Sequence, residues 1–223
     1  MVNRTLYGLK QAPRAWFDKL SDFLLQLGFF SSLADPSLFI CHSNHGVLIL
    51  ILYVDDMVVT GDNPQRIQWL ISQLSTQFSM KDLGFLHHFL GIEVHKIGTD
   101  LFLNQHRPDL SSSVNYVCQF LQAPIVANFQ LVKRILRYLQ GTVELGLRIT
   151  SDSSLDLYGF SDANWAGCPT TRRSTSGYCT FLGSNCISWS AKKQPTVARS
   201  SAEAKYKAMA STAAELTWIS TLL

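Results

Sequence analysis

The sequence predicts an α/β (α+β) chain in which helices are mixed with short antiparallel strands. Several stretches repeat apolar residues at helical spacing, and others are short apolar runs, rich in β-branched residues, that end at turn residues. With 47% hydrophobic and 16% charged residues over 223 positions, the composition is that of a folded globular protein. The polar stretch Thr150–Ser154 has no apolar period, so we expect a domain boundary there.

The first half of the chain predicts a helix, a β-hairpin and a second helix. Apolar residues fall on one stripe between residues 15 and 27, and Gly28 follows as a cap. Two apolar strands within residues 47–60 predict the hairpin, and Asn63 followed by Pro64 is typical of a helix start. The other elements expected in this half are short strands near residues 85–94 and 101–103.

The second half begins with two predicted helices, one opened by Pro108 and one covering residues 126–140 up to Gly141. We expect the latter to bury an apolar stripe that consists of Leu131, Val132, Ile135, Leu136 and Leu139. Beyond the boundary, strands are expected at residues 155–160, 177–182 and 186–190, followed by a helix from Ala202 to Leu223. The apolar stripe of that last helix would be Ala202, Tyr206, Met209, Ala213 and Leu216.

Composition also narrows the cellular setting. The first ten residues lack the apolar core of a secretory signal, and the longest apolar run, Val47–Val54, is too short to span a bilayer. The five cysteines show no close Cys-x-x-Cys spacing, so we interpret them as free thiols rather than zinc ligands. We therefore expect an intracellular protein, cytoplasmic or nuclear, with no membrane partner.

The net charge of +3 lies entirely in the last part of the chain. Residues 1–154 hold 12 basic and 12 acidic side chains, whereas residues 155–223 hold 7 basic and 4 acidic ones. The pairs Arg172-Arg173 and Lys192-Lys193 are the clusters there, and Lys133, Arg134 and Arg137 share the outer face of the predicted helix over residues 126–140. A solvated surface and a phosphate-contacting surface are both open interpretations of these groups.

Adjacent carboxylates mark the tip of the predicted hairpin at Tyr53-Val54-Asp55-Asp56. Close carboxylates repel each other, so a tight cluster of them calls for a hard cation such as Mg²⁺, which phosphoryl-transfer enzymes use in pairs. Aspartate is also a common turn residue, however, and these four residues by themselves favour that simpler interpretation.

The wider sequence reverses that judgement. In fixed order the chain carries LYGLKQAPRAW at residues 6–16, YVDD at 53–56, KDLG at 81–84 and FLGIEV at 89–94. Together these motifs resemble the reverse transcriptase of copia-type retrotransposons over about residues 4–105. The resemblance implies that residues 1–105 are a partial polymerase palm in which Asp55 and Asp56 bind catalytic Mg²⁺ or Mn²⁺. It also implies that Gln11 and Tyr53 lie near the incoming nucleotide, and that FLGIEV forms the hairpin that holds the primer.

The rest of the chain resembles the later part of the same Pol polyprotein. RPDL at 107–110 and RILRYLQG at 134–141 resemble a helical connection segment over residues 106–150. YGFSDANWAG at 158–167, RRSTSG at 172–177, ISWSAKKQP at 187–195 and SSAEAKY at 200–206 resemble the N-terminal part of a ribonuclease H-like domain over residues 155–223. The resemblance implies that Asp162 is the first acidic metal ligand of that domain.

The second acidic ligand of the domain is replaced in this chain. Related sequences read Thr-Glu-Ala-Glu-Tyr, and the position of the second Glu, which we take as the ligand, is Lys205 here. Glu203 is the alternative ligand, but Ser200 and Glu203 have the spacing of a capping box. Positions 203 and 205 are about 200° apart on a helix, so they cannot both face one metal ion. On the predicted stripe, position 205 lies closer to the packed face. A lysine there would oppose Mg²⁺.

Two further departures point to lost activity. The family's third palm aspartate lies upstream of residue 1, and its remaining ribonuclease H ligands lie beyond residue 223. Near Gln105–Arg107, two family segments that are normally several dozen residues apart are joined, which indicates a deleted thumb-like connection. We therefore expect a catalytically defective fragment of an RNA-directed DNA polymerase with a ribonuclease H-like region.

The expected partners follow from the ancestral reaction: an RNA template, a DNA primer or an RNA–DNA hybrid, and other Pol chains. Two alternatives belong to other classes. One is a non-catalytic nucleic-acid-binding module that uses the basic face of residues 155–223, which a steep loss of binding with salt would support. The other is a non-functional remnant that folds poorly because sheet edges and apolar faces are uncovered, which a broad, non-cooperative melt would support.

Overall fold

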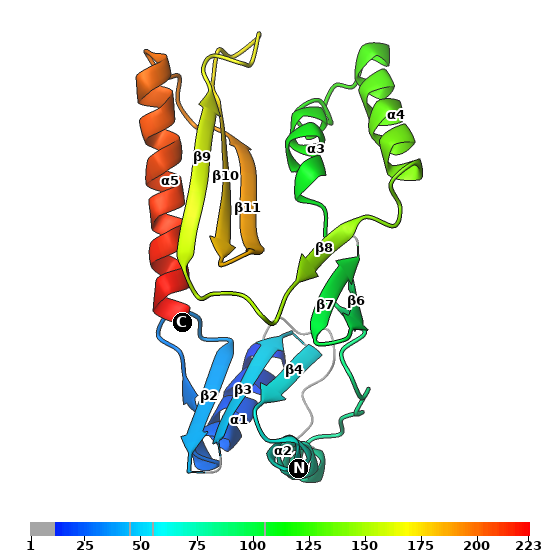
Figure 1. Cartoon of the computed structure of the whole chain (residues 1–223), viewed down its shortest axis with the longest axis vertical. Helices are drawn as coiled ribbons and strands as arrows, with labels where there is room; N and C mark the ends of the chain where they lie inside the picture. Colours follow the sequence, from blue (N-terminus) through cyan, green and yellow to red (C-terminus); the bar gives the residue numbers. More distant parts are fainter. Residues whose placement is uncertain (1–11, 45, 55, 105) are drawn as a thin grey trace. The chain divides into compact units, whose positions relative to one another are not determined.

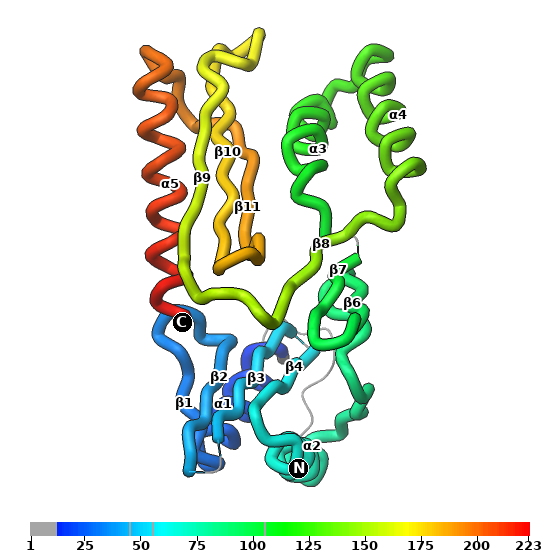
Figure 2. The backbone as a smooth tube through the Cα atoms, in the orientation of Figure 1, coloured from blue at the N-terminus to red at the C-terminus, as the bar shows by residue number. Residues whose placement is uncertain are grey.

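The computed structural model describes residues 12–44, 46–54, 56–104 and 106–223, shown as a ribbon in Figure 1 and as a chain trace in Figure 2. Over these residues the chain is a mixed α/β protein with three antiparallel sheets and five α-helices. It divides into two compact units, residues 1–86 with Leu222 and residues 87–221 with Leu223. Every helix in the described ranges is too short or too polar to cross a bilayer.

The first unit is a four-stranded antiparallel sheet with two helices. Its strands lie in the order β1-β2-β3-β4, so each pairs with its neighbour in the chain. The predicted start of the second helix is confirmed, because the side chain of Asn63 accepts a hydrogen bond from the amide of Gln65, and Pro64 is the first helical residue. The elements are α1 (Ala12–Gln26), β1 (Phe30–Ser31), β2 (Leu38–Ser43), β3 (Gly46–Tyr53), β4 (Asp56–Gly61) and α2 (Pro64–Gln77).

A single apolar core holds this unit together. Alternate residues of β3 point to opposite faces, so Leu48, Leu50 and Leu52 are buried while Ile51 and Tyr53 are exposed. The buried face packs against apolar residues of both helices, which explains why the helices carry apolar stripes. The core consists of Leu20, Leu24, Phe29, Phe39, Cys41, Leu48, Leu50, Leu52, Leu70, Leu74 and Phe78.

The second unit starts with a four-stranded antiparallel sheet in the order β5-β6-β7-β8. Its last two strands are separated in the chain by a helical excursion, yet Asn104 of β7 pairs with Gly146 of β8. The trace in Figure 2 shows the chain returning from α4 into β8 beside β7. The elements are β5 (His88–Phe89), β6 (Ile92–Ile97), β7 (Asp100–Asn104), a 3₁₀ turn (Pro108–Leu110), α3 (Ser111–Cys118), α4 (Val126–Gln140) and β8 (Gly146–Ile149).

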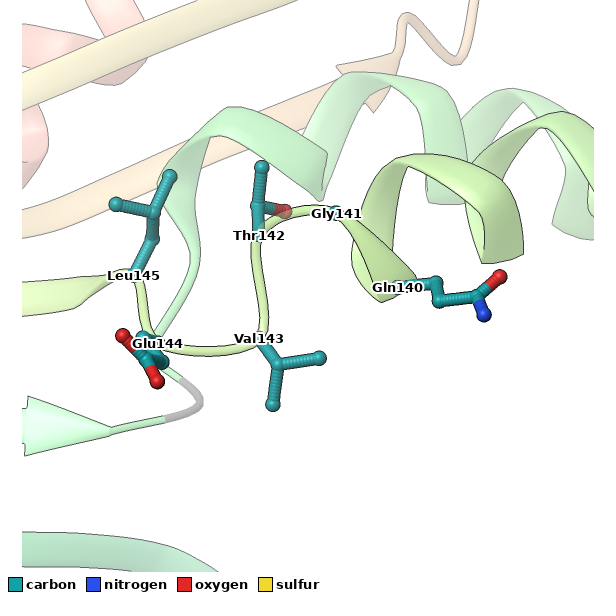
Figure 3. Close-up of a pocket in the computed structure, with 6 residues that line it drawn as sticks. All are labelled: Gln140, Gly141, Thr142, Val143, Glu144 and Leu145. Atoms are coloured by element: carbon teal, nitrogen blue, oxygen red, sulfur yellow. The ribbon is translucent and has the colours of Figure 1, made fainter.

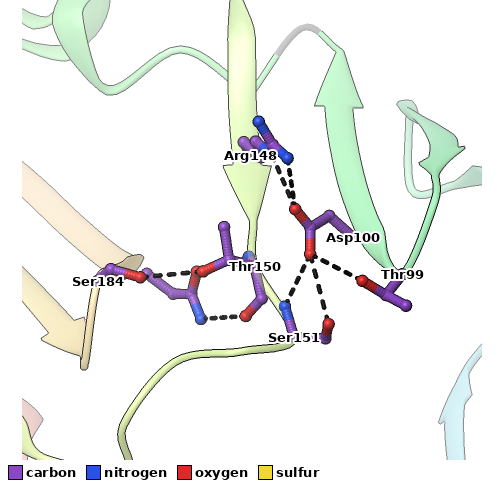
Figure 4. A network of polar contacts seen from close by, with 7 residues as sticks. Thr99, Asp100, Arg148, Thr150, Ser151 and Ser184 are labelled. Atoms are coloured by element: carbon purple, nitrogen blue, oxygen red, sulfur yellow. Dashed lines mark hydrogen bonds and ion pairs between the residues drawn. The ribbon is translucent and has the colours of Figure 1, made fainter.

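A polar network surrounds the return of the chain from this sheet (Figure 4). The buried carboxylate of Asp100 accepts hydrogen bonds from Arg148 Nε at 2.9 Å and from the amide of Ser151 at 3.0 Å. Thr150 is bonded to Asn185 in the same region. The Asn185 side chain accepts a hydrogen bond from the Thr150 amide and donates one to the Thr150 carbonyl. The predicted boundary stretch is therefore hydrogen-bonded both to Asp100 of the preceding sheet and to Asn185 of the following one. The three predicted domain ranges stay predictions.

The remainder of the second unit is a three-stranded antiparallel sheet with one long helix along it, as Figure 1 shows. Its order is β11-β10-β9, so β9 pairs only with β10 within this sheet. All four predicted elements are present with shifted ends. They are β9 (Leu157–Asn164), β10 (Thr175–Leu182), β11 (Asn185–Lys193) and α5 (Ser201–Leu222).

The predicted stripe of α5 is wrong, and that of α4 is on the packed side but only half-buried. The ends of α4 agree with the prediction, and four of the five stripe residues are half-buried while Leu136 is exposed, because the neighbouring α3 is only eight residues long. In α5 the predicted Tyr206 and Met209 are exposed, and the buried residues are Ala204, Ala208, Thr212 and Ile219. Small residues face the sheet because they permit close approach to Ala163 and Ala198.

Candidate functional site

The Tyr53–Asp56 hairpin tip is strained. Tyr53, the last residue of β3, pairs directly with Asp56, the first residue of β4, which leaves a two-residue turn. Val54 in this turn has a φ of +52°, a left-handed conformation that β-branched residues rarely adopt. Such strain costs on the order of 1–3 kcal/mol and collects at functional sites.

The predicted palm residues are only partly within the described ranges. Asp56 and Tyr53 are both exposed at the tip, where they are accessible to a metal ion or nucleotide. Asp55 and Gln11 lie outside the described residues. Among the described residues, no three His, Cys, Asp or Glu side chains gather in a way that could hold a metal ion. The Mg²⁺ site at this hairpin therefore stays a prediction.

Asp162 lies near the end of β9, on the strand that forms one edge of the three-stranded sheet. It pairs with Gly177 of β10, and its side chain is 81% exposed. The next residue, Ala163, is buried against Ala204 and Ala208 of α5. This packing places the start of α5 beside the end of β9.

Glu203 is engaged at the N-terminus of α5. Its amide donates to the Ser200 hydroxyl at 3.1 Å, and its carboxylate accepts from the Arg199 amide at 2.7 Å. In a capping box, the Glu203 side chain would accept a hydrogen bond from the amide of the N-cap residue, Ser200. Here it accepts from the amide of Arg199, the residue before the cap. Its carboxylate also pairs with Lys207 at 2.9 Å. The hydrogen bonds from Lys207 and from the Arg199 amide lower the pKa of Glu203, so the carboxylate is ionised and engaged in the cap.

Lys205 is the α5 residue that reaches Asp162, with its Nζ atom 3.8 Å from Oδ1. Because Ala204 is the buried residue between them, Glu203 and Lys205 flank the packed face on opposite sides. At about 100° per residue, the buried stripe of Ala204, Ala208, Thr212 and Ile219 is centred nearer to position 205 than to position 203, in the direction expected, and the separation of the two positions around the helix also holds. An ammonium group beside Asp162 repels a cation, so the residues here do not fit a Mg²⁺ ion.

A cavity of about 670 Å³ between α3 and the β9–β11 sheet also includes Asp162. Its walls combine the hydroxyl groups of Ser111–Ser113 with the aromatic rings of Phe160 and Trp189. In the sequence, only the run of three serines could have pointed to this cavity. A second cavity of about 420 Å³ lies at the turn of residues 140–145 and contains none of the predicted site residues (Figure 3).

Cys168, in the β9–β10 loop, is a second group that the sequence patterns do not single out. Lys193 lies 2.8 Å from its sulfur, and this hydrogen bond, with others from Thr171, lowers the pKa of the thiol to about 6. The thiol is therefore largely ionised at neutral pH, unlike a typical free cysteine. The Lys192-Lys193 cluster was the available signal, but nothing in the sequence paired it with residue 168.

Comparison with known proteins assigns the family. Residues 1–124 match the family described as "Reverse transcriptase (RNA-dependent DNA polymerase)". The chain belongs to this reverse transcriptase family.

Several relatives are Pol polyproteins of retrotransposons. The chain is 36% identical to the retrovirus-related Pol polyprotein from transposon RE1 of Arabidopsis thaliana, with all of this chain and 19% of the polyprotein covered. It is 34% identical to the corresponding RE2 polyprotein over the same shares. It is also 43% identical to an uncharacterized mitochondrial protein of Arabidopsis thaliana, over 78% of this chain and 95% of that protein. No solved structure matches the chain.

The lengths of these matches carry further information. The chain spans about a fifth of the RE1 polyprotein. The RE1 alignment runs over 277 positions, which exceeds the 223 residues of this chain by 54. The chain therefore lacks residues at 54 or more aligned positions that the relative fills.

Proposed function

We infer that the chain is a retrotransposon-derived reverse transcriptase and ribonuclease H-like region whose catalytic centres are defective. The observation that carries this proposal is the contact between Lys205 and Asp162. The ribonuclease H-like part of the proposal is supported by the three-stranded antiparallel sheet, its strand-end Asp162 and the α5 helix. Lys205 places a cation where the ribonuclease H resemblance implies a carboxylate.

Charge decides the effect of this replacement. At about 4 Å, two unit charges interact by roughly 1 kcal/mol in water and roughly 4 kcal/mol near a protein surface, and a divalent ion doubles the figure. Changing an acidic ligand to lysine turns that attraction into a repulsion of similar size. Glu203 does not compensate, because it is held by the Arg199 amide and Lys207 on the other flank of α5.

Hybrid cleavage tests this proposal directly. The purified chain would be incubated with an RNA–DNA hybrid carrying a labelled RNA strand, in Mg²⁺ and separately in Mn²⁺. We expect no cleavage above that of an Asp162→Asn variant, which serves as the control for contaminating nuclease. Cleavage that Asp162→Asn abolishes would overturn the proposal.

The polymerase half is proposed to be defective for a different reason. The relatives fill 54 or more positions that this chain lacks, and we place the loss between Asn104 and Arg107, where the sequence joins two distant family segments. A thumb-like connection that grips template and primer would then be missing. In primer extension on an RNA template with Mg²⁺ or Mn²⁺, we expect no product above that of the Asp55→Asn/Asp56→Asn variant. Extension that this variant abolishes would refute a dead polymerase.

Charge favours a second candidate, a non-catalytic nucleic-acid-binding module. The excess of basic over acidic side chains in residues 155–223 includes Arg172, Arg173 and Lys192, which are all exposed. Binding through such groups is electrostatic and weakens steeply with salt. Retained binding of an RNA–DNA hybrid without cleavage or extension would favour this candidate.

A further inference from the structure

The outward side of α4 carries positive charges only. This side, here called the outer face of α4, consists of Ala127, Gln130, Lys133, Arg134, Arg137 and Gln140, which are all exposed. It contains three cations, two amides and no carboxylate, and no acidic residue occurs anywhere in the helix. A solvated helix face usually mixes both signs of charge, so this composition calls for an explanation.

The opposite side of α4 packs against α3, which Figure 1 shows between α4 and the β9–β11 sheet. Its half-buried residues are Leu131, Val132, Ile135 and Leu139. At about 100° per residue, Lys133, Arg134 and Arg137 are centred almost opposite this stripe. The packing against α3 therefore presents all three cations outward.

Four other basic side chains of the second unit have acidic partners. Arg107 pairs with Asp109, Arg148 with Asp100, Lys205 with Asp162 and Lys207 with Glu203. Within the described residues, none of the ion pairs involves the three cations of α4. Lys133 lies over the ring of Phe129, 5.0 Å from its centre, which leaves its ammonium group unneutralised. The outer face of α4 is thus an uncompensated positive surface.

We propose that the outer face of α4 binds the phosphate backbone of a nucleic-acid duplex. Lys133 and Arg137 are one turn apart, about 6 Å along the helix axis. A duplex carries one negative charge per roughly 1.7 Å of its axis, so three phosphates can lie within reach of the three cations. Gln130 and Gln140 add amide donors at either end. The proposal rests on the nucleic-acid partner of the proposed function, but not on either catalytic defect.

A phosphate backbone fits this surface better than a membrane does. An interfacial helix binds lipid through its apolar stripe, and in α4 that stripe is half-buried against α3, on the side away from the three cations. Contacts to phosphate carry no sequence information, so binding should be independent of base sequence. Each phosphate contact that is lost should lower the slope of log affinity against log salt by about 1.

The test compares two triple variants of the full chain that lose the same charge. The first, Lys133→Gln/Arg134→Gln/Arg137→Gln, removes the cations of α4, and glutamine keeps a similar helix propensity. The second, Arg172→Gln/Arg173→Gln/Lys192→Gln, removes three exposed cations from the basic residues 155–223. Binding of a fluorescent RNA–DNA hybrid of about two helical turns would be measured by anisotropy between about 50 and 200 mM KCl, with circular dichroism as a check on folding.

We expect the α4 variant to bind at least tenfold more weakly at 50 mM KCl, with a salt slope lower by about 2–3. The second variant should lose less than half as much binding free energy for the hybrid as the α4 variant. Equal losses in both variants would mean that net charge alone drives binding, and no loss in the α4 variant would place binding elsewhere; either result overturns the proposal. Absence of hybrid binding by the unaltered chain, or binding only to anionic vesicles, would also overturn it. None of these outcomes bears on the cleavage and extension assays.

Discussion

The ammonium nitrogen of Lys205 lies 3.8 Å from a carboxylate oxygen of Asp162, which joins the first turns of α5 to the end of β9. The side chains of the two residues are 62% and 81% exposed, so water screens this ion pair. The pair therefore contributes little to stability, about 0–1 kcal/mol at most. Its effect is on what can bind at Asp162, because a cation already lies there.

Reversing the charge at position 205 should create affinity for a divalent ion. Lys205→Glu would place a second carboxylate beside Asp162, and paired carboxylates are good ligands for Mg²⁺ and Mn²⁺. We expect Mn²⁺ titrated into the full chain to bind this variant at least tenfold more tightly than the unaltered chain, as measured by water-proton relaxation. Lys205→Gln, which removes the cation without adding a ligand, should give a smaller gain. Equal Mn²⁺ affinity in all three proteins would show that position 205 does not face the site.

Local signals in the sequence are sufficient to predict where the helices and strands lie, but not which of their residues are packed. Asn63 and Pro64 mark the start of α2 because capping and the fixed φ of proline act within a few residues. The packed side of α5 could not be read in the same way, because periodicity favours large apolar residues such as Tyr206 and Met209. The structure instead buries Ala204 and Ala208, since the closeness of the sheet sets the size that fits.

The candidate site shows the same division between local and long-range information. Asp162 and Lys205 could each be picked out by motif, but their 3.8 Å contact depends on how α5 lies along β9. The effect of Lys193 on Cys168 depends likewise on the approach of residues 25 positions apart. Short motifs identify residue types, whereas electrostatic partners are set by the tertiary fold.

Substitutions in α5 can distinguish the observed packed face from the predicted one. Ala208→Leu would force extra atoms into the contact with Ala163, and overpacking of this kind typically costs about 1–3 kcal/mol. Met209→Ala removes a side chain that is 55% exposed and should change stability by less than about 0.5 kcal/mol. Urea denaturation of the second unit, monitored through the hydrogen exchange of α5, would measure the stability change of each variant. A larger loss from Met209→Ala than from Ala208→Leu would restore the face predicted from periodicity.

The strain at Val54 predicts a stabilising substitution. Its φ of +52° costs a β-branched residue more than it costs asparagine, which tolerates the left-handed conformation. Val54→Asn should therefore slow hydrogen exchange in β3 and β4, corresponding to a gain of about 0.5–1 kcal/mol. Val54→Ile retains the branch and should give no gain. Faster exchange in Val54→Asn would mean that the valine side chain stabilises the turn by more than the strain costs.

Asp109 should make the second unit sensitive to acid. The hydrogen bond from Arg107 lowers the pKa of Asp109 from its ordinary 3.8 to about 2, with a further contribution from Tyr138. Because the folded-state pKa lies below the unfolded one, the associated stability is fully present above about pH 4 and is lost as the pH falls towards 2. Asp109→Asn should flatten the fall in the unfolding midpoint of this unit between pH 5 and 2.5. The exposed Asp152→Asn serves as the control and should leave the fall unchanged.

Removing the contact between Asp109 and Arg107 should also lower the stability of the second unit at neutral pH. The Arg107 side chain is only 8% exposed and bonds to Asp109 and to the carbonyl of Thr142, so it joins the start of the helical excursion to its end. Asp109→Ala would leave a nearly buried guanidinium without its anion, at a cost of about 1–3 kcal/mol. We expect faster hydrogen exchange in α3 and α4 of that variant at pH 7. Unchanged exchange there would show that the carbonyl and hydroxyl of Thr142 suffice.

The two units should differ in stability because their cores differ in kind. The first unit has a contiguous core of eleven buried residues, most of them leucine and phenylalanine, whereas the buried cluster of the second unit consists of four alanines. Burial of a leucine side chain contributes about 1.5–3 kcal/mol, and alanine far less. We expect hydrogen exchange to protect β2 and β3 longest, α5 for an intermediate time, and α3 and α4, which contain no buried residue, the least.

Two alanine substitutions test the cause of this order. Leu50→Ala, at a fully buried position, should cost about 2–5 kcal/mol and speed exchange throughout the first unit, whereas Leu136→Ala, at a position 57% exposed, should change little in the second. Protection of α4 as long as that of β3 would contradict the expected order and imply a partner or packing that covers α4. A melt without any cooperative step would instead favour the poorly folded remnant, because a leucine core that forms in the first unit must unfold as one body.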